Sequence, residues 1–459
     1  MKLPTALHMH NPTGSPYKNR MQRDATMKIS VIGTGYVGII SAVGLANLGH
    51  SVTCIDVDKE KIAKVNKGMP PIYEAGLQEQ LQSALSSGKL VGKTDYASIS
   101  DADLVLICVG TPSLEDGSMD MKFVRAAAAQ VAKNLSGKFT VIAVRSTVVP
   151  GTTEQIVGGT IKSISGKITG EGFGLAMVPE FLKEGSALED FNSPQRIIIG
   201  CNDEKTRALL EQLHSRLNCP KFFTGIKTAE MIKYASNSFL AAKISFANEI
   251  ASMCEKMGID IDDVMDGVGM DSRIGNKFLV AGCGFGGSCF PKDVKALMYA
   301  ANVLGVRPIL LNSVMEVNKK QQAKLVGMLA SHMDVQGKTV ALLGLAFKEG
   351  TDDVRESPAL IAIERLLAAG AKVRAYDPAA MQNMGKIFPQ IQYAQSWAEC
   401  LKGADAALLI SAWKEFYKPA QEYKKALGNA PFFDARRILD AHQAKKAGLQ
   451  YYCIGRGEK

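Results

Sequence analysis

The sequence has no uninterrupted apolar run that approaches the roughly 18 residues needed to cross a bilayer as a helix. Residues 1–26 are polar, carry three prolines, and lack both an apolar core segment and a small-residue cleavage site. They therefore do not match a secretory signal. We expect residues 1–26 to form a flexible leader, with the folded protein starting near Met27.

Paired cysteines are also missing from the sequence. Its nine cysteines are an odd number and show no CxxC pair or other regular spacing. This pattern argues against a disulfide framework and against a zinc site. We therefore expect reduced thiols, a cytoplasmic location and no bound metal.

Long runs of one charge sign are absent too. The net charge of +9 is modest for 459 residues and includes no basic block of the kind that binds nucleic acid. We expect neither a nucleic-acid nor a membrane partner, whereas small anionic ligands such as nucleotides suit this charge. With 46% apolar and 22% charged residues, the composition is that of a soluble globular protein, and the length predicts roughly three domains.

A glycine-rich turn near the start carries the first chemical indication. Residues 27–33 are rich in apolar β-branched side chains, which predicts a buried strand, and a helical run follows at residues 37–48. Between them lies a GxGxxG pattern in the strand–turn–helix setting that dinucleotide binding requires. In such a turn Gly33 allows the sharp bend, Gly35 lets the backbone approach a pyrophosphate, and Gly38 lets helix and strand pack closely.

A carboxylate about twenty residues after this turn indicates which cofactor binds. The second predicted strand, residues 51–56, ends at Asp56. Its carboxylate would accept hydrogen bonds from both ribose hydroxyls and would repel a 2′-phosphate. We therefore predict NAD rather than NADP.

The alternation of strands and helices continues, and polar side chains follow the strand ends. Further strands are predicted at residues 103–110, 140–147 and 174–180. Ligands gather at the carboxyl ends of strands in open α/β sheets, so Thr111 and Thr147 are candidates to line the nicotinamide side. The third of these strands ends at Glu180, and Glu184 lies in the loop that follows. An ordinary loop position is the alternative for each of these four side chains.

A helical segment from Thr228 to Met257 is apolar on most faces, which predicts burial in a core or an interface. Lys233 and Asn237 lie four residues apart and so share one face of this helix. A polar pair on such a helix costs free energy unless it is used, which favours a functional role for both. The helix could also separate two domains and take part in a dimer interface. More helix is predicted at residues 262–267 and 312–332.

The stretch from Lys277 to Asp293 combines glycines, two cysteines and a Lys–Asp pair. A helix is predicted through residue 301, with Pro291 at its first position. Cys289 would then lie just ahead of a helix N-terminus and close to an ammonium, and both features favour the reactive thiolate. The sequence leaves open the alternative that Cys289 is a buried, unreactive side chain.

The opening pattern returns near residue 337. Strands at residues 337–344 and 371–377 flank a helix at residues 357–369, and the second strand again ends on an aspartate. The second and third fingerprint glycines are missing, so we expect a mononucleotide rather than a dinucleotide site. Charged side chains crowd one strand-end loop of this half, namely Lys348, Asp352, Asp353 and Arg355.

Eight motifs together resemble the UDP-glucose 6-dehydrogenase family of nucleotide-sugar dehydrogenases, and they run through most of the chain from Met27 to Pro419. They are VIGTGYVG, VGTPS, RSTV, PEFLKEGSA, AEMIKYASN, GMDSRIGNKFL, GFGGSCFPKD and TDDVRESPA. The resemblance implies an NAD-dependent, four-electron oxidation of UDP-glucose at C6 to UDP-glucuronate, without release of the aldehyde. Such an enzyme serves polysaccharide biosynthesis.

The expected architecture is α/β, with two Rossmann-like doubly wound domains joined by a long central helical region. By resemblance, residues 27–220 bind NAD and residues 334–459 bind the UDP-sugar. Residues 221–333 carry the catalytic loop and form a homodimer or a higher homo-oligomer.

The resemblance assigns a role to each candidate catalytic residue. Cys289 would add as a thiolate to the C6 aldehyde, giving a thiohemiacetal that is oxidised to a thioester and then hydrolysed. Lys233 and Asn237 would stabilise the developing oxyanion. Asp293 would order a water with Lys233. Glu180 would lie near the hydrolytic water, which Thr147 would hold.

The resemblance also implies two sets of ligand contacts. The cofactor set is Gly33, Gly35, Tyr36, Val37, Gly38, Asp56, Lys61, Thr111, Thr147, Glu184, Lys292 and Arg355. The substrate set is Glu180, Phe181, Leu182, Lys183, Lys233, Asn237, Arg273, Lys277, Phe278, Leu279, Gly282, Phe347 and Lys348. Within this second set, Arg273 would reach the sugar nucleotide of the neighbouring subunit.

Two departures from the family pattern leave alternatives open. Met177 and Val178 stand before Pro179, where the family often has Ser-Asn, and this affects the polar network around Glu180. The motif RSTVVPGTT resembles the GDP-mannose and N-acetyl-sugar dehydrogenases as much as the UDP-glucose enzymes. The alternative substrate is therefore GDP-mannose or a UDP-N-acetylhexosamine. A non-catalytic, NAD-dependent sensor protein is the alternative from a different class.

Overall fold

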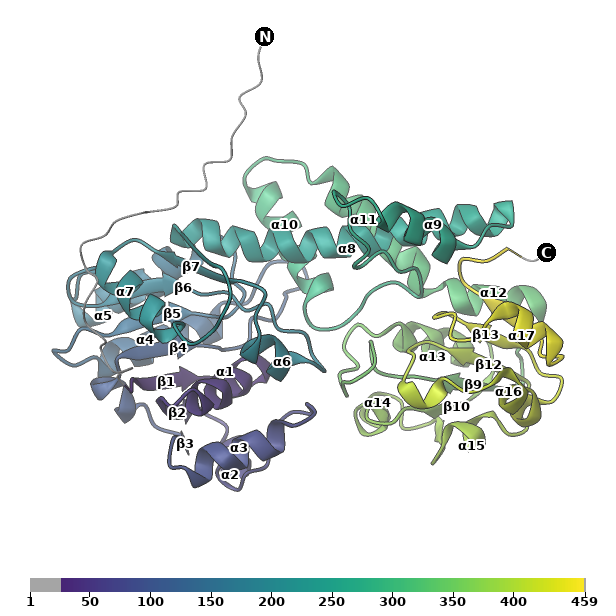
Figure 1. The fold of residues 1–459 in the computed structure, drawn as a ribbon, viewed down its shortest axis with the longest axis horizontal. Coiled ribbons are helices and arrows are strands. Elements are labelled where there is room, and N and C mark those ends of the chain that lie inside the picture. The colour runs from purple at the N-terminus through teal and green to yellow at the C-terminus, as the bar shows by residue number, and fades with distance from the viewer. Residues whose placement is uncertain (1–25, 458–459) are drawn as a thin grey trace, which may run out of the picture.

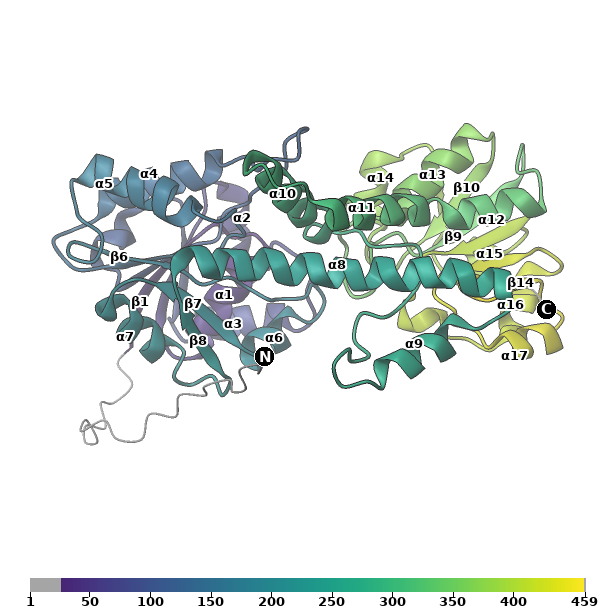
Figure 2. The ribbon, with the colours of Figure 1, turned by 90° about the horizontal axis from the view of Figure 1, so that it is seen from above.

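The computed structural model describes residues 26–457, which form two α/β domains joined by a long helix (Figure 1). This helix, α8 (Ile226–Met257), runs from one domain to the other in both views (Figure 1, Figure 2). The predicted leader lies outside the described residues, apart from Thr26. The predicted α/β class, with two doubly wound domains and a helical connection, is confirmed. No helix among residues 26–457 combines the length and apolarity of a membrane span.

Within the described residues, the N-terminal domain is built on an eight-stranded sheet. Its order is β3-β2-β1-β4-β5-β6-β7-β8, and neighbours are parallel except β6 and β7, which are antiparallel. The strands are β1 (Lys28–Ile32), β2 (Ser51–Ile55), β3 (Leu90–Lys93), β4 (Leu104–Ile107), β5 (Val141–Val144), β6 (Gly174–Met177), β7 (Ile197–Cys201) and β8 (Lys221–Thr224). The predicted division after residue 220 thus falls just before β8, which pairs with β7.

Helices cover both faces of this sheet, because its strands are apolar on both sides. One face is covered by α1 (Tyr36–Asn47), α3 (Leu77–Ser86), α6 (Ala187–Asn192) and α7 (Glu204–Leu213). The other is covered by α4 (Lys122–Asn134), the π-helical turn η2 (Thr153–Gly158) and α5 (Gly159–Ser165). The remaining elements are α2 (Lys59–Asn66) and the 3₁₀ turn η1 (Ala97–Asp101).

The central region adds four helices of described residues to α8. They are α9 (Ile261–Gly269), α10 (Phe290–Val303), α11 (Ile309–Gln322) and α12 (Lys324–His332). The prediction of one helix at residues 312–332 is wrong, because the helix is interrupted at Ala323. The Ala323 amide donates a hydrogen bond to the Lys320 carbonyl, three residues back. The side-chain amides of the preceding Gln321 and Gln322 donate to the carbonyls of Gly282 and Phe285, which belong to the glycine-rich loop of residues 277–289.

The C-terminal domain repeats the doubly wound plan on a smaller, all-parallel sheet in the order β11-β10-β9-β12-β13-β14. Its strands are β9 (Thr339–Leu343), β10 (Lys372–Tyr376), β11 (Gln392–Tyr393), β12 (Ala406–Leu409), β13 (Phe432–Asp434) and β14 (Tyr451–Cys453). Its helices are α13 (Pro358–Ala368), α14 (Met381–Ile387), α15 (Trp397–Leu401), α16 (Ala420–Leu427) and α17 (Ala441–Lys446), with the 3₁₀ turn η3 (Lys414–Phe416).

The two domains share one detail at their first turn. Asp56, after β2, accepts a hydrogen bond from the Thr34 amide at 2.8 Å. Asp377, after β10, accepts from the amides of Leu345 and Ala346 at 2.7 and 3.0 Å. In each domain the aspartate that ends the second strand therefore stabilises the turn after the first, as expected if the second half repeats the first.

Candidate active site

A cavity of about 810 Å³ is lined by both domains, by α8 and by the glycine-rich loop that leads into α10. Its lining includes Phe181, Leu182, Lys183 and Glu184 from the β6–α6 connection, Lys233 and Asn237 from α8, Lys277, Phe278 and Cys289 from the loop, and Phe347 and Lys348 from the C-terminal domain. The structure therefore brings onto one cavity candidate residues that are widely separated in the sequence.

Cys289 lies at the N-cap position of α10, directly before the helix as predicted. Its Sγ is 3.6 Å from the Ser288 hydroxyl. The predicted thiolate is wrong for this state of the site, because burial raises the pKa of the Cys289 thiol to about 11. That value already includes the nearby Glu180 and Asp293 carboxylates, which act to raise the pKa, and the Lys233 ammonium, which acts to lower it. Desolvation thus outweighs the helix N-terminus and the neighbouring ammonium.

Lys233 and Glu180 form a buried ion pair with Nζ and Oε1 3.0 Å apart, and their side chains are only 4% and 6% exposed. Burial acts to raise the pKa of Glu180, but the Lys233 ammonium and the Leu182 amide outweigh it, so the pKa is lowered. Burial likewise acts to lower the pKa of Lys233, but the surrounding anions, Glu180 first, raise it above its ordinary value. Both groups are therefore charged at neutral pH.

Asn237 is held by Asp293, a fully buried residue of α10. The Asn237 amide Nδ2 donates to Asp293 Oδ2 at 2.7 Å, and the Lys292 ammonium is paired with the other carboxylate oxygen. Lys292, predicted to contact the cofactor, thus neutralises Asp293. Because an amide nitrogen carries two hydrogens, Asn237 keeps one donor for a ligand.

Glu184 joins the two domains at the cavity. Its carboxylate accepts hydrogen bonds from Ser288 Oγ at 3.0 Å and from Thr351 Oγ1 at 3.2 Å. Burial raises its pKa, and the Asp353 carboxylate adds to this effect. Glu184 therefore orients the residue next to Cys289 and also contacts the C-terminal domain.

The first turn of the N-terminal domain fits a dinucleotide. Gly33 has φ +94, and a Cβ there would lie 2.7 Å from the Cys108 carbonyl oxygen, while a Cβ at Gly38 would lie 1.9 Å from the Gly33 carbonyl oxygen. At Gly35 a Cβ would meet no described atom within 4 Å. Gly35 is also the N-cap of α1, where no side chain caps the helix. Open space beside uncapped amides suits a pyrophosphate.

These glycines give a matched pair of predictions. We expect Gly38→Ala to lower the melting temperature by several degrees, because its Cβ collides with backbone. Gly35→Ala should leave the melting temperature unchanged and raise the KM for NAD⁺ about tenfold or more, because its Cβ fills only the cofactor's space. Thermal unfolding and NAD⁺ titration check both, with Gly159→Ala, a helix position with open space, as the control. An unchanged KM in Gly35→Ala contradicts the assigned role.

Other predicted cofactor contacts surround this turn. Asp56 is half-buried; burial acts to raise its pKa, but hydrogen bonds from Thr34 and Asp58 lower it, so the carboxylate is ionised. The Tyr36 hydroxyl donates to Glu74, and the Gly185 amide donates to the same Glu74 carboxylate at 2.7 Å. Val37 packs at the edge of the core, and Lys61 is exposed.

Four further predicted contacts do not line the cavity: Leu279, Gly282, Thr111 and Thr147. Leu279 packs with α8 and α9 rather than lining the cavity, and Gly282 is bound through its amide to Asn248. Thr111 donates to the Thr147 carbonyl at 3.0 Å, after β4 and β5.

Two predicted arginines point to solvent. Arg273 is 87% exposed and pairs with Asp271 of its own loop. Arg355 is 67% exposed and pairs with Asp353, also nearby in sequence. Each guanidinium is thus held by a local carboxylate and remains accessible from outside the chain.

Two cavity-lining arginines escaped the sequence analysis. Arg436 follows β13, and its Nε donates to the Ile410 carbonyl at 2.7 Å. Arg145 follows β5, and its Nε has no partner among the described residues. Burial lowers the pKa of both. Both follow the carboxyl end of a strand in the structure, where ligands collect, but Arg145 falls inside the strand predicted at residues 140–147, so its position was not recognised.

The sequence matches three models of one family in chain order. The UDP-glucose/GDP-mannose dehydrogenase family's NAD binding domain matches residues 27–218, its central domain residues 227–320 and its UDP binding domain residues 341–441. The chain belongs to the UDP-glucose/GDP-mannose dehydrogenase family. It is an NAD-dependent oxidoreductase of nucleotide sugars, and the resemblance inferred from the eight motifs is confirmed.

Individual members of this dehydrogenase family are similar over nearly their full length. A UDP-glucose 6-dehydrogenase of Bacillus subtilis is 43% identical over 434 residues, which cover 94% of this chain and 98% of the relative. The structure of a UDP-glucose dehydrogenase from Pyrobaculum islandicum has a TM-score of 0.88 at 37% identity, over 95% of this chain and 99% of that one. A UDP-D-ManNAc dehydrogenase from Pyrococcus horikoshii has a TM-score of 0.83 at 28% identity, over 94% and 99%.

Proposed function

We propose that the protein oxidises UDP-glucose at C6 to UDP-glucuronate in two successive steps, with Cys289 holding the sugar covalently between them. The observation that carries this proposal is the placement of Cys289 on one cavity with Lys233 and Asn237, between the two domains. A nucleophile is useful there because covalent catalysis divides one difficult conversion into easier steps.

The N-terminal domain supplies the cofactor site. The α1 N-terminus at Gly35 would receive the pyrophosphate, and the ionised Asp56 would accept hydrogen bonds from the ribose hydroxyls. When bound, NAD⁺ accepts one hydride from C6 in each oxidation. The roles of Thr111, Thr147, Glu184 and Arg355 toward the cofactor stay predictions.

Lys233 and Asn237 would hold the C6 oxygen. The Lys233 ammonium, kept charged by Glu180, donates to the oxygen as negative charge develops on it. Asn237 supplies a second donor, since Asp293 uses only one of its two amide hydrogens. Both donors are fixed before substrate binds, which lowers the reorganisation required during reaction.

Cys289 would act on the aldehyde. Its Sγ bonds to C6, the thiol proton leaves, and the former carbonyl oxygen is protonated to give a thiohemiacetal. Loss of the C6 hydride and of the hydroxyl proton converts this adduct into a thioester. Water then cleaves the S–C bond, releasing the sugar carboxylate and the free thiol. Glu180, which is ion-paired with the cavity-lining Lys233, would orient that water.

The choice of sugar nucleotide rests on sequence identity and on the residues of the glycine-rich loop that line the cavity. The relatives named UDP-glucose 6-dehydrogenase are 41–43% identical, whereas a GDP-mannose dehydrogenase of known structure is 34% identical and the UDP-D-ManNAc enzyme is 28% identical. The similarity therefore favours UDP-glucose over GDP-mannose or a UDP-N-acetylhexosamine. The GMDSRIGNKFL and GFGGSCFPKD segments contribute Lys277, Phe278 and Cys289 to the cavity, which supports the same choice.

Counting NADH tests the proposed function. We expect two NADH formed per UDP-glucose consumed, measured by absorbance with limiting sugar nucleotide and excess NAD⁺. A panel with GDP-mannose and UDP-N-acetylhexosamines at equal concentration should give at least about tenfold lower kcat/KM. One NADH per sugar, or faster turnover of a panel member than of UDP-glucose, contradicts the proposal.

We further propose a homodimer or higher homo-oligomer formed through the central region. Large apolar side chains of α8 remain exposed in the single chain, namely Phe239 at 67%, Phe246 at 51%, Met253 at 51% and Met257 at 69%. Exposed apolar side chains of this kind usually mark a surface that becomes buried when two chains associate. Arg273 would then be placed to reach a neighbouring site. The cytoplasmic location inferred from the cysteine pattern stays a prediction.

A further inference from the structure

The turn after β13 is fixed by one buried carboxylate. Asp434 is fully buried and accepts hydrogen bonds from the amides of Arg436 at 2.7 Å, Arg437 at 2.8 Å and Ile438 at 2.8 Å. The Tyr451 hydroxyl donates to it at 2.9 Å. Four donors on one carboxylate leave the turn little freedom, so the two consecutive arginines have defined directions.

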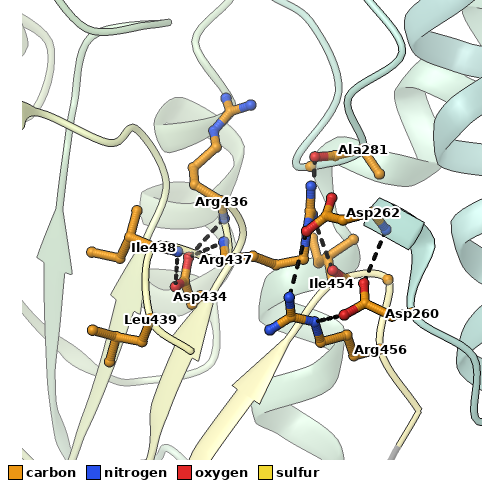
Figure 3. Close-up of polar contacts among 12 residues, drawn as sticks. Asp260, Asp262, Ala281, Asp434, Arg436, Arg437, Ile438, Leu439, Ile454 and Arg456 are labelled. Atoms are coloured by element: carbon orange, nitrogen blue, oxygen red, sulfur yellow. Dashed lines mark hydrogen bonds and ion pairs between the residues drawn. The ribbon is translucent and has the colours of Figure 1, made fainter. Parts of the chain in front are cut away.

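Those directions differ, as Figure 3 shows. Arg436 lines the cavity, whereas the Arg437 side chain extends toward α9 and the start of the glycine-rich loop. Arg437 Nε donates to Asp262 Oδ2 at 2.8 Å, and its Nη1 donates to the carbonyls of Ala281 and Ile454, both at 3.1 Å. The side chain is 3% exposed. Three acceptors from three segments thus converge on one buried guanidinium.

Backbone strain marks the same place. Among the described residues, three non-glycine residues have positive φ: Phe278 at 66, Glu356 at 50 and Arg437 at 54. Phe278 lies in the glycine-rich loop, and the Glu356 carbonyl lies 2.1 Å from where a Cβ at Gly286 would be. Such strain persists only where surrounding contacts impose it, and it gathers at ligand sites. Phe278 thus lies in this loop, and Glu356 and Arg437 contact it.

The loop and the arginine turn touch directly. A Cβ at Gly282 would lie 2.8 Å from Arg436 Nη1 and 3.0 Å from the Ala435 carbonyl oxygen. Gly282 follows Ala281, whose carbonyl Arg437 binds. Arg437 thus holds the loop at the point where it packs against the cavity-lining Arg436, shortly after Phe278.

We infer that Arg437 is a positioning residue of the sugar-nucleotide site: it clamps the 277–282 segment against the β13 turn so that Phe278 and Arg436 face the cavity together. Arg437 does not line the cavity and acts only through these neighbours. The inference rests on the proposed function for the identity of the ligand. It predicts that loss of Arg437 weakens binding of the uridine nucleotide without weakening that of NAD⁺.

A neighbouring arginine provides a matched control. Arg456 also joins the C-terminal segment to α9, because its Nε donates to Asp260 and its Nη2 lies 3.5 Å from Asp262 (Figure 3). It makes none of the described hydrogen bonds to the 277–289 segment. If Arg437 served only to dock α9 on the C-terminal domain, removing Arg456 would have the same consequences.

The test compares Arg437→Met with Arg456→Met in the full-length protein. We expect both to lower the melting temperature, but only Arg437→Met to raise the KM for UDP-glucose and the Kd for UDP by about tenfold. The KM for NAD⁺ should change less than about twofold in both variants. Arg437→Lys, which retains one donor group of shorter reach, should give an intermediate KM and provides the same readout if the methionine variant does not fold.

Equal effects of the two substitutions on UDP affinity, or unchanged UDP affinity in both Arg437 variants, would overturn the inference. Calorimetric binding of UDP does not depend on turnover. The inference can therefore fail while wild-type turnover of UDP-glucose upholds the proposed function. Conversely, wild-type protein that binds UDP but does not oxidise UDP-glucose rejects the proposed function and leaves the binding comparison intact.

Discussion

Cys289→Ser is expected to abolish formation of UDP-glucuronate, lowering its steady-state rate by at least about 10³-fold, while the protein stays folded. A serine hydroxyl occupies almost the same space but ionises far less readily than a thiol, even one whose pKa burial has raised to about 11. The C6 aldehyde would then lack the nucleophile that commits it to the second oxidation. Mass spectrometry of the quenched protein and NADH formation in a single turnover measure the result.

The pattern of NADH release distinguishes this outcome from general damage. Cys289→Ser should form at most one NADH per site and retain the aldehyde or a slow adduct, whereas the wild type should continue to two. Cys219→Ser is the matched control, because Cys219 is also partly exposed but does not line the cavity. Continued turnover of Cys289→Ser to the acid at near wild-type rate removes Cys289 from the mechanism.

The fold was predictable because its determinants are local. The strand–GxGxxG–helix order around Gly33 and the acid at Asp56 specify a Rossmann-type unit within a short stretch. The second copy repeats the strand–turn–helix order without the second and third glycines and again places an aspartate, Asp377, after its second strand. The break at Ala323 was not predictable from periodicity, since it accompanies contacts between Gln321, Gln322 and a loop that is distant in the sequence.

The candidate site was predictable in composition but not in its electrostatics. The spacing of Lys233 and Asn237 indicated one helix face, and both do line the cavity. The direction of the pKa shift of the Cys289 thiol depends on burial by residues from several segments. The residues next to Cys289 in the sequence do not reveal that burial. Arg436 and Arg437 were missed for a related reason: adjacent in sequence, they take separate roles only because Asp434 fixes the turn and φ of Arg437 is positive.

Lys233→Met is expected to lower kcat by about 10³-fold, because it removes the cation that would meet negative charge on the C6 oxygen. It should also destabilise the fold by about 3–5 kcal/mol, since Glu180 is left as a buried carboxylate without its partner. The double variant Lys233→Met/Glu180→Gln removes both charges and should regain much of the stability but none of the activity. Denaturant unfolding measures the stability of the wild type and of the two variants, and initial rates measure their activity, so the loss of stability is distinguished from the loss of catalysis.

The same substitution gives a pH readout that does not depend on turnover. Lys233 lowers the pKa of Cys289, which burial and two carboxylates raise to about 11, so its removal must raise that pKa further. Below the pKa, the thiolate fraction falls about tenfold for each unit by which the pKa rises. Alkylation of Cys289 by iodoacetamide between pH 8 and 10 should therefore be slower in Lys233→Met than in wild type and should still increase with pH. Equal alkylation rates in the two proteins would mean that the Lys233 ammonium does not lower the pKa of the Cys289 thiol.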